Sequence, residues 1–184
     1  QLLIDAVNAG DSAAVMSLLR AGAQPEFVDA NGYSPIHWAA GPDARGFALG
    51  DTIQRRACIA ILVRVASVDI NREDGTQFHL RAVQHAVALN LVGCVKMLAS
   101  LGADLSGTLH WAVSSKSHGV LRELLQLGVQ GGAVKGEWHG ASPLMLAAMQ
   151  CDAHAMNIIL EHAAAKGQQH VDSVVRCGQA GNQR

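Results

Sequence analysis

The stretch Asn31-Gly32-Tyr33-Ser34-Pro35-Ile36-His37-Trp38-Ala39-Ala40 decides the fold of this 184-residue chain. Asn31-Gly32 favours a turn with positive φ, and Ser34 can cap a helix. Pro35 stands at the first helical position, where its missing N–H costs nothing. The small pair Ala39-Ala40 leaves room for a neighbouring helix. The stretch therefore predicts a hairpin tip that runs directly into a short helix.

Four further versions of this stretch occur along the chain. Anchored on the first residue of each small pair, the five copies lie at Ala6, Ala39, Ala86, Ala112 and Ala147, separated by 33, 47, 26 and 35 residues. A glycine follows the anchor by 16 residues in three copies, at Gly22, Gly102 and Gly128. Such a glycine commonly ends a helix. The sequence therefore predicts a chain built from repeated helix pairs.

On these residues the chain resembles the ankyrin repeat family, whose period is roughly 33 residues and whose signature is Thr-Pro-Leu-His-x-Ala-Ala followed by a second helix and Gly-Ala-Asp. The matching stretches are Ser34-Pro35-Ile36-His37-Trp38-Ala39-Ala40, Thr108-Leu109-His110-Trp111-Ala112-Val113, Ser142-Pro143-Leu144-Met145-Leu146-Ala147-Ala148, Gly22-Ala23 and Gly102-Ala103-Asp104. The resemblance covers residues 2 to about 166. It implies an all-α repeat solenoid of stacked helix-turn-helix pairs with short β-hairpin or loop connections.

One domain is expected over residues 1–184, with repeats at about 1–30, 31–71, 72–104, 105–130 and 137–166. Copy two carries an insertion at 41–51, because its helix end at Ser67 lies 28 residues after the anchor instead of 16. A functional loop and a harmless extension both remain open for this insertion. Residues 167–184 are interpreted as a polar tail or as the start of a further repeat.

Other departures from the repeat pattern also lead to predictions. Gly107 follows Gly102 by only 5 residues, so we predict that the hairpin between copies three and four is missing or collapsed. Copy three lacks the motif proline and histidine, and we expect it to be the least stable part of the array.

Ser12 is predicted to cap the second helix of copy one, and Thr52 is predicted to cap the second helix of copy two. Phe78 is expected to be a buried or edge anchor.

The composition narrows the functional classes. The chain is 49% hydrophobic and 4% aromatic with a net charge of -1, which gives no electrostatic reason to expect nucleic acid as a partner. The group of Arg55, Arg56 and Arg64 is interpreted as solvated surface. No apolar run approaches the roughly 18 residues of a membrane span, so no membrane insertion is expected in this segment. Because the chain begins at Gln1, we interpret it as a segment of a longer protein.

The four cysteines, Cys58, Cys94, Cys151 and Cys177, are scattered without a CxxC pair, and we interpret them as reduced thiols of an intracellular protein, cytoplasmic or nuclear. No two of the nine histidines have the helical spacing that a zinc site favours, and no nucleophile or phosphate-binding motif is present. We therefore expect no metal, no cofactor and no catalytic residue, and we expect the segment not to be an enzyme.

The family resemblance also implies roles for single residues. The motif histidines His37 and His110 would bond backbone in the adjacent hairpin, and the remaining histidines are interpreted as surface residues. Hairpin tips and the exposed side of the first helices would form a concave surface for a protein or peptide. That surface would contain Asp29, Asn31, Tyr33, Trp38, Trp111, Glu137, Trp138 and His139. Large aromatic side chains suit such contacts, although Trp38 and Trp111 could instead pack between adjacent helices.

The leading hypothesis is thus a noncatalytic protein interaction module, a scaffold or adaptor that binds a protein or peptide. One alternative is a targeting or regulatory segment of a larger enzyme or channel, with the activity outside these residues. A third is a small-molecule or enzymatic pocket between copies two and three, covered by the insertion around Phe47. The partner's identity does not follow from the fold, because repeat folds are reused for unrelated partners.

Overall fold

A computed structural model describes residues 2–41, 52–130 and 140–180, with the backbone alone for 168–180. This part of the chain forms ten α-helices and no strand, which confirms the predicted all-helical class for the described residues. The helices are α1 (Leu2–Asn8), α2 (Ser12–Arg20), α3 (Pro35–Ala40), α4 (Ile53–Arg64), α5 (Ala82–Ala88), α6 (Val92–Ser100), α7 (Thr108–Ser114), α8 (His118–Gln126), α9 (Pro143–Met149) and α10 (Ala153–Ala180).

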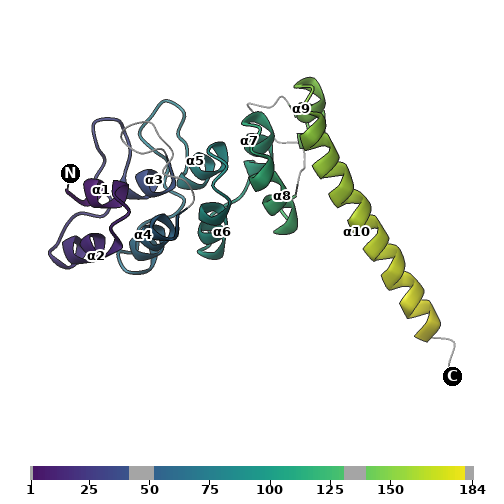
Figure 1. Ribbon diagram of the computed structural model, residues 1–184, viewed down its shortest axis with the longest axis horizontal. Helices are drawn as coiled ribbons and strands as arrows, with labels where there is room; N and C mark the ends of the chain where they lie inside the picture. Colours follow the sequence, from purple (N-terminus) through teal and green to yellow (C-terminus); the bar gives the residue numbers. More distant parts are fainter. Residues whose placement is uncertain (1, 42–51, 131–139, 181–184) are drawn as a thin grey trace.

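The helices pack in two rows. Each odd-numbered helix contacts the even-numbered helix that follows it, and neighbours within each row also contact each other. Figure 1 shows α1, α3, α5, α7 and α9 above α2, α4, α6 and α8, with α10 running away from the rows at the C-terminal end. We call these the first-helix row and the second-helix row.

Small anchor residues lie where the two rows meet. These side chains are at most 1% exposed, as expected if small residues leave room for a neighbouring helix: Ala39, Ala86, Ala112 and Ala147. Branched aliphatic side chains such as Ile59, Val95 and Leu121 fill the space beside them and are fully buried. Close-packed cores of this kind tolerate little change in side-chain volume. The core is therefore continuous along the rows in the described part of the chain.

Helix beginnings follow the predicted caps with one exception. Ser34 precedes α3, Pro35 is its first residue, and the Thr52 hydroxyl accepts the Arg55 N–H at 3.2 Å at the start of α4. The prediction that Ser12 caps α2 is wrong. Asp11 is the cap, and its carboxylate accepts the Ala14 N–H at 2.9 Å, because Ser12 is already the first helical residue.

Helix ends follow the predicted glycines. Gly22, Gly102 and Gly128 have φ between +79° and +91°, the left-handed region that favours glycine. Ser67 takes the same place after α4 with φ +53°, which confirms the end inferred for copy two. The missing hairpin is also confirmed, because only residues 101–107 join α6 to α7.

Three further sequence-based expectations are wrong in whole or in part. Residues 167–180 continue α10 as a helix and therefore do not form the hairpin of a further repeat. Phe78 is 63% exposed and is therefore not buried. Arg55 is buried, and its guanidinium donates to the carbonyls of Ala39 and Gly41 at the end of α3. Of the predicted insertion at 41–51, residues 42–51 lie outside the described part of the chain. None of the helices in that part is long and apolar enough to cross a membrane.

Candidate functional site

Two loops project from the first-helix row on either side of α3. We call residues 23–33 the first finger and residues 67–81 the second finger; Glu73 and Arg81 form an isolated antiparallel bridge in the second. The fingers touch at two glycines, where the Gly75 N–H donates to the Gly32 carbonyl at 2.6 Å. A Cβ on Gly32 would lie 2.7 Å from the carbonyl carbon of Gly75. Only glycine therefore allows this approach of the two backbones.

Asp29 organises the first finger. Its carboxylate accepts the backbone N–H groups of Asn31 and Tyr33, each at 2.9 Å, and the indole N–H of Trp38 at 3.0 Å. Trp38 is only 9% exposed, and the Tyr33 ring packs edge-on against it at 5.4 Å. Asp29 and Trp38, two of the residues predicted to contact a partner, therefore stabilise the finger itself, whereas the Asn31 side chain is exposed.

Asp74 organises the second finger. It accepts the backbone N–H of Thr76 at 3.0 Å, the Thr76 hydroxyl at 2.6 Å and the N–H of Leu80 at 3.2 Å. His85 on α5 donates its Nε2–H to the same carboxylate at 2.9 Å. Asp74 is 3% exposed, so this carboxylate is almost completely removed from water. The interpretation of His85 as a surface residue is wrong, because the side chain is buried against the finger.

The motif histidines make the backbone bonds that the resemblance implies. His37 accepts the Ser34 N–H at Nδ1, 3.3 Å away, which leaves Nε2–H to donate to the Arg72 carbonyl at 3.0 Å. His110 Nε2 bonds the Ala141 carbonyl at 2.9 Å. Each histidine thus ties one helix pair to the segment that leads into a later one. His118 departs from the surface interpretation too, since it is half-buried and bonds the Asp152 carboxylate at 2.7 Å.

The titratable groups beneath the fingers are perturbed mainly by burial. Burial lowers the pKa of His37 and of His85, in the second case against the effect of Asp74. Burial together with the charges of Asp74 and Asp29 raises the pKa of Tyr33. Burial alone would raise the pKa of Asp74, but its bonds from Thr76 and His85 hold that pKa below the ordinary value. Both histidines are therefore neutral near pH 7.

The short connection between α6 and α7 is held by Asp104. Its carboxylate accepts the Ser106 N–H at 2.9 Å and the Ser106 hydroxyl at 2.6 Å, and it forms an ion pair with Arg81. The Asp104 N–H donates to Asn71 of the second finger at 2.8 Å. Sequence reasoning missed this link, although Asp74-Gly75-Thr76 and Asp104-Leu105-Ser106 share a turn pattern that predicts a local carboxylate bond.

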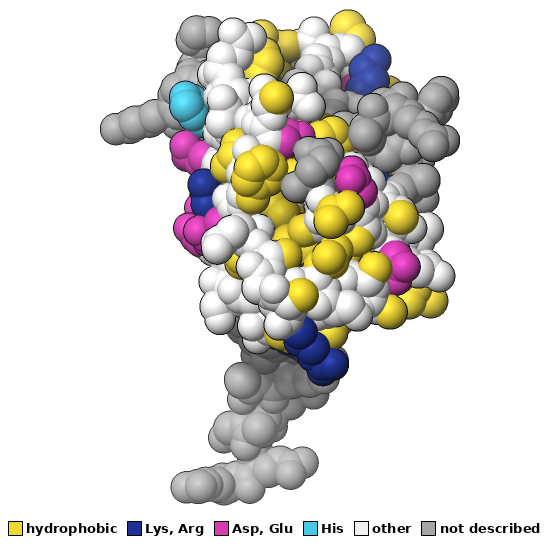
Figure 2. Space-filling view, turned by 90° about the vertical axis from the view of Figure 1, so that its left-hand side faces the viewer, with side chains coloured by type: hydrophobic (Ala, Val, Ile, Leu, Met, Phe, Trp, Pro, Cys, Tyr) yellow, Lys and Arg dark blue, Asp and Glu magenta, His cyan; other side chains and the backbone are white. Residues whose placement is uncertain are grey.

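Among the described residues, exposed apolar side chains occur on both rows and at the α1 end. Phe78 on the second finger is 63% exposed, Met149 at the end of α9 is 76% exposed, and Trp111 on α7 is half-buried. On the second-helix row, Ile53 is 73% exposed. At the α1 and α2 end, apolar side chains gather around a hollow of about 370 Å³ lined by Leu2, Leu18, Phe27 and Pro35 among others (Figure 2). Glu137, Trp138 and His139 lie outside the described residues.

Within the described ranges, no group of three or more His, Cys, Asp or Glu side chains is placed to hold a metal ion. A scan against protein-family models found no matching family. A search of curated proteins found no match either.

Proposed function

We propose that the chain is an ankyrin-like repeat array that acts as a noncatalytic protein interaction module. The observation that carries this proposal is the repeated tie between neighbouring units, in which His37 bonds Arg72 and His110 bonds Ala141. These bonds sit at the positions where the resembling family places them. The helix pairs between them follow one another in two rows, which suits an elongated docking surface more than an enclosed catalytic site.

The proposed docking surface consists of the finger tips and the exposed side of the first-helix row. Asn31 and Phe78 stand on the fingers, and Trp111 and Met149 lie on α7 and α9. Aromatic and methionine side chains bind well because they bury much area and adapt to a partner's shape. The fingers are braced from below by Asp29 and Asp74, so the tips are preorganised for binding, which lowers the entropic cost of association.

Site-specific photo-crosslinking tests the proposal. A benzophenone amino acid is placed at Phe78 or at Met149, and a matched control carries it at Ile53 on the second-helix row. All three side chains are more than half exposed, so none of the changes disturbs the core. We expect one protein to be captured from both finger-side positions and not from Ile53.

Binding of the captured partner, once purified, is then measured with the Phe78→Ala/Met149→Ala double variant. We expect its affinity to fall at least tenfold, because exposed anchors of this kind dominate binding energy. The Ile53→Ala variant should bind as the parent does. Capture from Ile53 alone, or an unchanged affinity of the double variant, would refute the proposed surface.

A further inference from the structure

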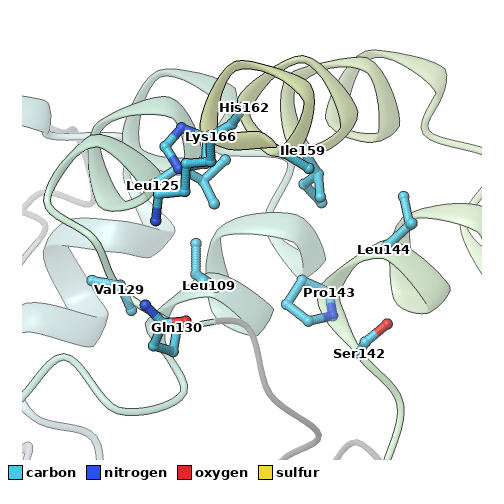
Figure 3. Close-up of a pocket in the computed structure, with 11 residues that line it drawn as sticks. Leu109, Leu125, Val129, Gln130, Ser142, Pro143, Leu144, Ile159, His162 and Lys166 are labelled. Atoms are coloured by element: carbon cyan, nitrogen blue, oxygen red, sulfur yellow. The ribbon is translucent and has the colours of Figure 1, made fainter. Parts of the chain in front are cut away.

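A pocket of about 240 Å³ lies between the last two helix pairs, away from the fingers. Its walls come from α7, α8, α9 and α10 and from the segment after α8. Figure 3 shows Ile159, His162 and Lys166 on α10 facing Leu109, Val129 and Pro143 across the space. Since an apolar cavity of about 150 Å³ can hold benzene, this pocket has room for a small organic molecule.

Most of the lining is apolar. Leu109, Leu125, Val129, Pro143 and Ile159 supply the hydrocarbon surface. Burying a hydrocarbon chain against such walls is favourable, at a rate proportional to the apolar area removed from water. The interior therefore suits an alkyl or aryl group.

The polar groups of the pocket point to an anion. His162 and Lys166 are four residues apart on α10, so their side chains share one face of the helix. Within the described residues, Nε2 of His162 is buried and has no hydrogen-bond partner, which is costly for a polar atom. As Nε2–H it can donate to a carboxylate, and the Lys166 ammonium beside it supplies the opposite charge.

The other polar side chains of the lining each already form one hydrogen bond within the protein. Ser142 borders the pocket, and its hydroxyl oxygen accepts the Met145 N–H at 3.2 Å, which leaves the hydroxyl proton able to donate to another group. Gln130 donates one amide N–H to the Gly128 carbonyl at 3.1 Å. The polar groups that border the pocket thus include several donors, and a ligand with acceptor oxygens at one end would satisfy them.

We propose that this pocket binds a small amphiphilic carboxylate, with the carboxylate at His162 and Lys166 and a short alkyl chain against Leu109, Leu125 and Ile159. The site is distinct from the proposed docking surface, because its lining includes none of Asn31, Phe78, Trp111 and Met149. Its test therefore succeeds or fails separately from the test of partner binding.

Octanoate is the probe, titrated into the full chain and followed by NMR of backbone amides and of the His162 ring nitrogens. We expect saturable shifts at Leu125, Val129 and Ile159, a shift of the Nε2 resonance, and a Kd on the order of 0.1 to 1 mM. Octanol and octylamine have the same number of carbons as octanoate but no carboxylate. They should bind at least tenfold more weakly.

Two variants locate the site. Lys166→Met removes the charge and keeps most of the side-chain volume, and Ala163→Leu fills the pocket from an exposed position of α10. Each should weaken octanoate binding about tenfold, whereas the matched control Lys116→Met, an exposed lysine between α7 and α8, should not change it. The proposal is overturned by any of three results: no saturable octanoate shifts below 10 mM, equal binding of octanol, or binding unaffected by either pocket variant.

Discussion

The second finger and the short turn before α7 use the same local chemistry in different surroundings. In each, an aspartate accepts the backbone N–H and the hydroxyl of the residue two positions later, Thr76 in one and Ser106 in the other. Asp74 is then buried under α5 and bonded by His85, whereas the Asp104 side chain stays 47% exposed beside Arg81. The comparison shows that a local turn pattern sets the backbone conformation, while burial determines how much the carboxylate contributes to the free energy of unfolding.

The largest expected effect is at Asp74. Asp74→Ala leaves the backbone N–H of Leu80 and the imidazole Nε2–H of His85 without their acceptor beneath the finger. We therefore expect the free energy of unfolding to fall by about 3 kcal/mol. Urea denaturation followed by circular dichroism measures the change. A loss no larger than that of Asp104→Ala would break the comparison, because burial would then add nothing.

The glycines give the next test. Gly32→Ala places a Cβ 2.7 Å from Gly75 and also forces alanine to φ +87°, whereas Gly102→Ala meets no atom within 4 Å at φ +91°. The backbone strain is therefore matched, at about 1 kcal/mol in each variant. We expect Gly32→Ala to cost roughly 2 kcal/mol more than Gly102→Ala, since overpacking against backbone costs about 1 to 3 kcal/mol. Equal midpoints in urea would show that the fingers do not need their contact.

Acidification should weaken the fingers before it affects the short turn. Burial lowers the pKa of His37 and His85, so below about pH 6.5 the unfolded chain binds protons that the folded chain does not. Stability is therefore retained above the unfolded pKa and lost as the pH falls from 7 to 5, by at most about 1.4 kcal/mol per pH unit for each histidine.

The variant His37→Gln sharpens this prediction. In copy three Gln84 takes the place of the motif histidine. Its side-chain Oε1 accepts the Arg81 backbone N–H at 2.8 Å, just as Nδ1 of His37 accepts the Ser34 backbone N–H. We expect the variant to fold and to show a shallower loss of unfolding free energy between pH 7 and 5. The same slope as in the parent would rule out His37 as a source of the effect.

The smallest effect belongs to the short turn. Hydrogen bonds from Ser106 and the ion pair with Arg81 lower the pKa of Asp104 to about 2, so its contribution is complete above about pH 4 and is lost as the pH falls toward 2. Because this side chain is half exposed, solvent screens the ion pair. Asp104→Ala should therefore cost only about 0.5 to 1 kcal/mol at pH 7. Thermal unfolding at pH 7 and pH 2 measures it, and an undiminished difference between parent and variant at pH 2 would contradict the assignment.

Copy three shows how far sequence reasoning reaches. Its missing proline and histidine led us to expect the least stable part of the array, and this stays a prediction. In the structure Gln84 supplies the cap, and Val83, Val87, Val95 and Leu98 are fully buried. We infer that amides of α5 and α6 resist hydrogen exchange at least as well as those of α2, which lies at the end of the row. Faster exchange in α5 and α6 would support the sequence-based expectation instead.

The sequence by itself determined the helix pairs, their anchors and most of their ends. These signals are local: a cap such as Thr52 acts within three residues, and a left-handed residue such as Gly102 or Ser67 ends the helix immediately before it. The absent finger between α6 and α7 followed from counting residues. Such features need no knowledge of what packs against them.

Only the tertiary structure decided which polar groups are buried and which apolar groups remain outside. Arg55 is buried because the end of α3 offers it two carbonyls, and His85 because the second finger folds Asp74 over it. Phe78 is exposed, although its large apolar side chain favours burial. Burial depends on contacts between segments far apart in the chain, such as His37 with Arg72, and a local pattern carries no information about them.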